Sequence, residues 1–164
     1  MYEQDVTYTV GAYLATLLSE DGRFEVQLSR PSPDTILGTN NTTSLAARVN
    51  AANSWPADYF LSIHCNANNN PAINGTECYV YDLYSESYWL AQAILTGIVY
   101  RMGTKDNGIY QNPSLYVLRN TQMPAVLVEL AYLTNAQDAQ KLSTDPYGFA
   151  FGIYYGLLDY FGLE

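Results

Sequence analysis

Apolar and polar residues follow two different periods along the chain, and these periods predict both helices and strands. Apolar residues at helical spacing predict an amphipathic helix over residues 3–20. Short apolar runs, continuous or alternating with polar residues, predict strands. The predicted strands are 24–29, 58–64, 75–81, 115–119 and 124–130. The other predicted helices are 44–53, 86–102, 135–142 and 146–162, with Ser44 as the N-cap of the first.

Strands and helices alternate in this prediction, which is typical of an α/β fold with a mostly parallel sheet. The length of 164 residues suits one domain with a substantial core, and no repeat or linker divides the chain. In such a sheet, ligands bind just beyond the carboxyl ends of the strands. Polar residues at strand ends are therefore the first candidates for a functional site.

Composition and charge exclude several classes of partner. Hydrophobic residues make up 48% of the chain and charged residues 14%, as in a globular protein. The net charge is −9 with seven Lys and Arg, which argues against a nucleic-acid partner, since phosphate binding needs a basic surface. No apolar run approaches the roughly 20 residues that span a membrane. The sixteen tyrosines could be core edges or a surface that stacks on sugar, and composition does not choose between these.

Three residues are candidates for chemistry, and each has an ordinary structural alternative. His64, the only histidine, ends the predicted strand 58–64, where it could also be a hydrogen-bonded histidine at a sheet edge. Glu129 lies in the apolar run "AVLVEL", where burial would perturb it, although it could instead reach solvent at a strand end. Glu3 opens the first helix, and the helix dipole alone favours an acid there. Cys65 and Cys78 have no metal-binding spacing, so we expect two small buried side chains, with a disulfide as the alternative.

Several segments, taken in order, resemble one known family. They are "YEQDVTYTVGAYLATLL", "SLAARVNAAN", "ADYFLSIHCNA", "GTECYVY" and "VLRNTQMPAVLVELAYLTNAQDAQKL". In order and spacing they look like the zinc-dependent N-acetylmuramoyl-L-alanine amidases of the amidase type 3 family, over nearly the whole chain. The resemblance implies an amidase-like catalytic domain over residues 1–164, with a mixed, mainly parallel sheet flanked by helices on both faces.

The resemblance also implies a reaction and the residues that perform it. Such enzymes hydrolyse the peptidoglycan amide that joins N-acetylmuramic acid to L-Ala of the stem peptide. By position in the motifs, Glu3 and His64 match two Zn²⁺ ligands, and Glu129 matches the catalytic glutamate that transfers protons. A catalytic zinc keeps one position open for water and lowers the pKa of that water towards about 7.

The chain departs from the family at its beginning. The family's first strand and the Gly-rich turn that carries a third zinc ligand, a His, would precede "YEQDV", and no second histidine replaces it. We expect that this sequence starts at an internal Met of a longer protein; the alternative is a natural variant with an impaired metal site. The zinc site is then incomplete, and the alternative function is an inactive module that binds the cell wall. We expect action outside the cell, at a bacterial wall, with a phage endolysin as the alternative.

Overall fold

The computed structural model describes residues 1–164 as six helices and four strands. In chain order the elements are α1 (Glu3–Asp21), α2 (Asn41–Ser54), β1 (Phe60–Asn66), β2 (Thr76–Val80), α3 (Glu86–Met102), β3 (Asp106–Gln111), α4 (Tyr116–Asn120), β4 (Ala125–Tyr132), α5 (Ala136–Thr144) and α6 (Pro146–Phe161).

The four strands form one mixed sheet in the order β1-β4-β2-β3. β1 and β4 run parallel, as do β2 and β3, while β4 and β2 are antiparallel. The predicted α/β class and the mixed, mainly parallel sheet are therefore confirmed. β1 lies at one edge of the sheet and β3 at the other.

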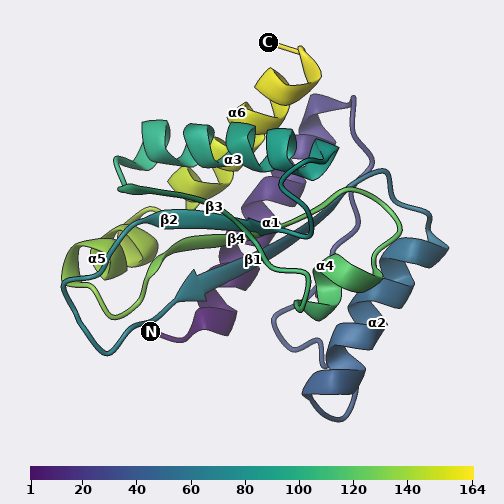
Figure 1. Cartoon of the computed structure of the whole chain (residues 1–164), viewed down its shortest axis with the longest axis horizontal. Coiled ribbons are helices and arrows are strands. Elements are labelled where there is room, and N and C mark those ends of the chain that lie inside the picture. The colour runs from purple at the N-terminus through teal and green to yellow at the C-terminus, as the bar shows by residue number, and fades with distance from the viewer.

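Helices cover both faces of the sheet, as the resemblance implies (Figure 1). The larger core joins one face to α1, α3 and α6, and its fully buried members include Val10, Ile98, Val128 and Ile153. A smaller cluster joins the other face to α2 and α4 through Val49 and Leu127. None of the helices is both long and apolar enough to span a bilayer.

The helices α3 and α6 approach closely because glycines line their contact. A Cβ built on Gly97 of α3 would lie 2.2 Å from the carbonyl oxygen of Gly152 in α6. A Cβ on Gly152 would in turn lie 2.8 Å from the Cα of Ile98. Gly156 is equally crowded, with the carbonyl oxygen of Ala93 at 2.5 Å. The two backbones therefore touch without side chains between them, and α6 packs on α3, which in turn lies against the sheet.

Two predicted strands are wrong. Residues 116–119 lie in the helix α4, with Leu115 as its N-cap, because the apolar run is short and a turn at Asn112 and Ser114 precedes it. Residues 24–29 are extended, with alternate side chains facing inward, but they form no strand because no other strand hydrogen-bonds to them. One strand was missed, because β3 is a mostly exposed edge strand with little apolar patterning.

The helix over 44–53 begins earlier than predicted. Asn40, and not Ser44, is its N-cap: the Asn40 side chain accepts a hydrogen bond from the backbone N–H of Thr43 at 2.9 Å. The Thr43 hydroxyl accepts one in return from the backbone N–H of Asn40 at 3.0 Å, which completes a capping box. An Asn–x–x–Thr pair in a polar loop does not stand out from its neighbours in the sequence.

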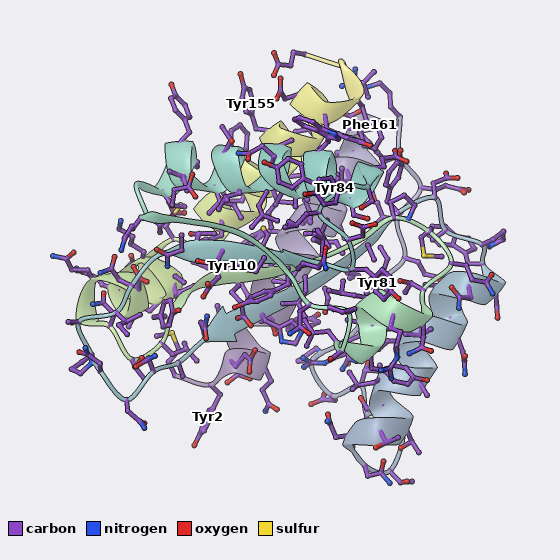
Figure 2. All side chains as sticks on the ribbon, viewed as in Figure 1. Tyr2, Tyr81, Tyr84, Tyr110, Tyr155 and Phe161 are labelled. Atoms are coloured by element: carbon purple, nitrogen blue, oxygen red, sulfur yellow. The ribbon has the colours of Figure 1, made fainter.

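The tyrosines do not form one stacking surface (Figure 2). Tyr2, Tyr84, Tyr110 and Tyr155 lie on separate parts of the molecule, and Tyr84 is 97% exposed. Tyr132, by contrast, is buried in the sheet. The sequence left open whether tyrosines mark core edges or a sugar-binding surface. In the structure several of them pack against another aromatic ring, as Tyr13 does against Tyr147 and Tyr79 against Tyr110.

We expect Gly152→Ala to lower the free energy of unfolding by about 1–3 kcal/mol, because the added methyl group forces α3 and α6 apart. Helix propensity alone would raise the free energy of unfolding by about 1 kcal/mol. A decrease in this free energy therefore identifies the close contact. Urea denaturation measures it. Gly11→Ala in α1 is the matched control, since its Cβ would meet only Leu28 Cδ2 at 3.9 Å. Equal stabilisation by both substitutions would contradict the close packing.

Candidate functional site

Three ionisable side chains form one row across the sheet. His64 of β1 is paired with Glu129 of β4, and Glu129 is paired with Glu77 of β2. Residues directly opposite one another on neighbouring strands point to the same face of a sheet. The next row on that face holds Leu127, which packs under α2 and α4. The three ionisable side chains therefore lie on the same face of the sheet as α2 and α4. They occupy the row next to Leu127, the last row that these helices cover.

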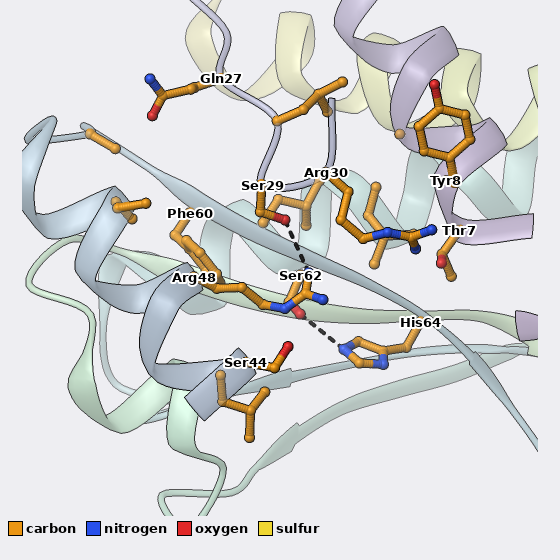
Figure 3. Close-up of a pocket in the computed structure, with 18 of the residues that line it drawn as sticks. Thr7, Tyr8, Gln27, Ser29, Arg30, Ser44, Arg48, Phe60, Ser62 and His64 are labelled. Atoms are coloured by element: carbon orange, nitrogen blue, oxygen red, sulfur yellow. Dashed lines mark hydrogen bonds between the residues drawn. The ribbon is translucent and has the colours of Figure 1, made fainter. Parts of the chain in front are cut away.

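Glu3 reaches the end of this row from the first turn of α1. Its Oε1 lies 3.1 Å from Nδ1 of His64 and accepts a hydrogen bond of 3.1 Å from the backbone N–H of Cys65. The other ring nitrogen of His64, Nε2, lies 2.9 Å from the hydroxyl of Ser62 (Figure 3). The Glu3 and His64 side chains are 44% and 38% exposed, so both remain accessible to a ligand. Two hydrogen bonds thus fix the orientation of the imidazole.

Glu129 is a half-buried residue whose carboxylate has one buried oxygen without a partner. Its Oε2 is the buried side-chain polar atom that has no hydrogen-bond partner in the protein. Burial raises the pKa of Glu129 to about 7, and the nearby charges of Glu3 and Glu77 add to this rise. A carboxylate that is costly to ionise and has a free oxygen is a good candidate for proton transfer near neutral pH.

Glu77 is a fourth site residue, which sequence reasoning missed. It is only 6% exposed, and it accepts hydrogen bonds from the amide of Asn66 and, at 2.7 Å, from the hydroxyl of Tyr132. A register shift between β1 and β4 pairs Asn66 with Tyr132 two residues beyond His64 and three beyond Glu129. An irregularity of this kind re-aims side chains next to functional sites. The signal that could have found Glu77 is the same as for Glu129: an acid within an apolar strand.

The two cysteines are free and buried, as expected, and the alternative disulfide is not formed. Burial, with the charges of Glu3 and Glu129, raises the pKa of the Cys65 thiol to about 12. Burial likewise raises the pKa of Cys78 well above its ordinary value. Both thiols are therefore protonated at neutral pH and act as packing groups.

Glu3 and His64 fit two positions around a zinc ion. Two ligand atoms at about 2.05 Å from a tetrahedral zinc lie about 3.3 Å apart, and the Glu3 and His64 atoms are separated by 3.1 Å. A catalytic zinc takes three protein ligands, however, and no group of three His, Cys, Asp or Glu side chains is arranged to hold a metal. Glu3 and His64 are therefore two donors, fewer than the three protein ligands that a catalytic zinc takes.

Comparison with known proteins matches the chain to one family. A model of the N-acetylmuramoyl-L-alanine amidase family matches residues 1–159. The N-acetylmuramoyl-L-alanine amidase LytC of Bacillus subtilis is 40% identical over 149 residues, which are 90% of this chain but 28% of LytC. The endolysin of Bacillus phage SPP1 is 32% identical over 151 residues, 88% of this chain and 52% of the endolysin. The chain thus spans only part of the length of these relatives.

A solved structure has the same fold. The crystal structure of N-acetylmuramoyl-L-alanine amidase from Clostridium difficile 630 has a TM-score of 0.87 and 33% sequence identity, and the match covers 99% of this chain and 85% of that one. The family model and the shared fold both extend over nearly all of the chain. This chain belongs to the N-acetylmuramoyl-L-alanine amidase family, amidase type 3.

Proposed function

We propose that this chain is a peptidoglycan hydrolase that cleaves the amide between N-acetylmuramic acid and L-Ala of the stem peptide. The observation that carries the proposal is the buried, unpaired Oε2 of Glu129, in one row with His64, which Glu3 contacts. Family membership supplies the class of substrate, and the row supplies a group suited to hydrolysis.

Glu129 is the general base in this proposal. It accepts a proton from a water molecule while the oxygen of that water attacks the carbonyl carbon of the scissile amide. It then gives the proton to the amide nitrogen as the C–N bond breaks, which leaves a carboxylic acid and the free amine of L-Ala. Because burial raises the pKa of Glu129 to about 7, the carboxylate both takes and returns a proton readily at neutral pH. Its Oε2 has no hydrogen-bond partner in the protein and so remains free to hold the proton.

Zinc would be held by Glu3 and His64. When bound in such a site, zinc polarises the carbonyl group and lowers the pKa of water. Two protein ligands do not hold a catalytic zinc firmly, so we infer that a third donor from outside this set of side chains is needed for full activity. The hydrogen bonds from Cys65 to Glu3 and between Ser62 and His64 would keep the two donors oriented.

A second function is supported by the missing ligand. A chain that lacks one zinc ligand and retains the rest of the fold could bind cell-wall fragments without cleaving them. On either function we place the protein outside the cell, at peptidoglycan. Its relatives include both a bacterial amidase and a phage endolysin, so the source can be a bacterium that remodels its own wall or a phage that lyses its host.

We expect Glu129→Gln to lower the rate of stem-peptide release from purified sacculi by about 10²–10⁴-fold, because glutamine cannot accept the proton. The assay contains excess zinc and measures new L-Ala amino termini. Glu20→Gln, an exposed substitution in α1, is the control and should leave the rate unchanged.

The same assay separates the two functions if the pelleted protein is also measured. If the unmodified chain hydrolyses peptidoglycan and Glu129→Gln does so at the same rate, Glu129 is not the base. A chain that pellets with sacculi in chelator and never releases peptide would be the binding module. No hydrolysis and no pelleting would contradict both functions.

The raised pKa of Glu129 predicts a pH-dependent stability. An unfolded glutamate ionises near 4.5, whereas folded Glu129 keeps its proton up to about 7. Folding therefore loses stability between these values as pH rises, by at most about 3 kcal/mol. Glu129→Gln lacks this loss. In chelator, the melting temperature of the variant minus that of the unmodified chain should increase from pH 4 to pH 8. A difference that stays constant would contradict the raised pKa.

A further inference from the structure

The row of ionisable side chains leads past Glu77 to an open surface on the edge strand β3. A register shift between β2 and β3 places two residues, Asn107 and Gly108, opposite Glu77. A Cβ built on Gly108 would meet no atom within 4 Å, so the surface is open at this point. A ligand that reaches Glu129 from this face of the sheet can therefore extend across β2 and over β3.

Tyr110 of β3 borders this open surface. It is paired with Tyr79 of β2, and Tyr79 is paired with Leu127 of β4, so the two tyrosines lie on the same face as Glu129. Tyr110 is 47% exposed, and in Figure 2 it lies over the sheet between α4 and α5. Its strand is two strand spacings, about 10 Å, from β4. Tyr110 therefore offers an aromatic ring within reach of a substrate that is bound at Glu129.

Two contacts hold the ring of Tyr110 in one orientation. Its hydroxyl donates a hydrogen bond of 2.7 Å to the backbone carbonyl oxygen of Asn107, which directs the ring along β3 towards the level of Glu77. The ring also packs against Tyr79, with centroids 5.6 Å apart and an angle of 31° between the ring planes. Tyr79 is itself half-buried against the apolar cluster that joins the sheet to α2 and α4. A ring that is already fixed loses little conformational entropy when a ligand stacks on it.

The charges near this tyrosine pair favour an uncharged ligand. Burial, with the charges of Glu77 and Glu129, raises the pKa of Tyr79 to about 12, so both carboxylates lie close to the pair. A free peptide carries at least a terminal carboxylate, which these groups repel. An N-acetylated sugar ring carries no charge, and its C–H groups, which are slightly positive, suit the negative face of an aromatic ring. The surroundings of Tyr110 therefore favour a sugar over a peptide.

We propose that Tyr110, supported by Tyr79, is a binding site for one sugar ring of the glycan chain. This inference rests on the proposed function, since the sugar would be held beside the amide that Glu129 hydrolyses. The two strand spacings between Glu129 and Tyr110 leave room for the lactyl group that joins the amide to the sugar. Tyr110 would then determine specificity, because amides that are linked to glycan bind in this place and free peptides do not.

The binding test uses the hexamer of N-acetylglucosamine, an uncharged glycan without peptide or scissile amide. NMR spectra of the ¹⁵N-labelled chain, recorded during titration, give the Kd and locate the sugar, and we expect the largest shifts at residues 107–111. Tyr110→Leu should raise the Kd about tenfold because the flat ring is lost, whereas Tyr110→Phe, which keeps the ring, should stay within about twofold. Tyr155→Leu is the matched control, because Tyr155 is 45% exposed but lies on α6, and it should leave the Kd unchanged.

A hydrolysis assay on a soluble muropeptide that carries its disaccharide separates this proposal from the proposed function. Tyr110→Leu should raise KM about tenfold and leave kcat within about twofold, because the ring binds the sugar and does not contact the amide. If no variant hydrolyses the muropeptide, the proposed function fails, and the NMR titration still decides whether the sugar site exists.

Three results would overturn the sugar site. One is an equal Kd for Tyr110→Leu and the unmodified chain, and another is a set of shifts that lies away from β3. The third is a free stem peptide that shifts residues 107–111 as strongly as the glycan does, because the peptide would then be the occupant.

Discussion

The register of the β-ladders is the constraint on which the candidate site depends. His64, Glu129 and Glu77 come from three different strands, and only the β1–β4 and β4–β2 registers align them. Because side chains alternate between faces, a slip of one residue would turn the affected side chain into the apolar core. Val128 and Cys78, the neighbours of Glu129 and Glu77 in sequence, are paired with each other and fully buried on the opposite face. They hold the register, because only this alignment buries both. Packing of the core on one face of the sheet therefore fixes the positions of the ionisable side chains on the other face.

Three carboxylates near one another in a partly buried site create an electrostatic conflict, and the structure resolves it unequally. Glu3 has His64 and a backbone N–H as partners, and Glu77 has Asn66 and Tyr132. Glu129 has an oxygen without a partner, so burial and the repulsion of the two other carboxylates raise its pKa. The same arrangement that leaves this group poorly stabilised as a charge makes it fit to exchange protons. The unequal sharing of partners thus separates Glu129, the proposed base, from Glu3 and Glu77, which both have hydrogen-bond partners.

The sequence predicts the parts of this fold that depend on local pattern. The helices over 3–20 and 86–102 and the strands that carry His64 and Glu129 follow directly from apolar periodicity. The edge strand β3 and the helix α4 do not, because short or exposed elements take their structure from neighbours that a linear pattern cannot identify. Residues 24–29 have the pattern of a strand and no partner, which only the folded chain reveals. Glu77 escaped notice because its role depends on register and on the irregularity that brings Tyr132 to it.

The proposed amidase site has two donors for zinc, Glu3 and His64, one fewer than a catalytic zinc takes. Calorimetric titration of zinc into the chelator-treated chain measures this binding, with Glu3→Gln and His64→Gln studied in parallel. We expect one zinc site, weaker than the roughly 10–16 kcal/mol of structural zinc sites, that either substitution abolishes. A tight site with one zinc per chain that survives His64→Gln would contradict it.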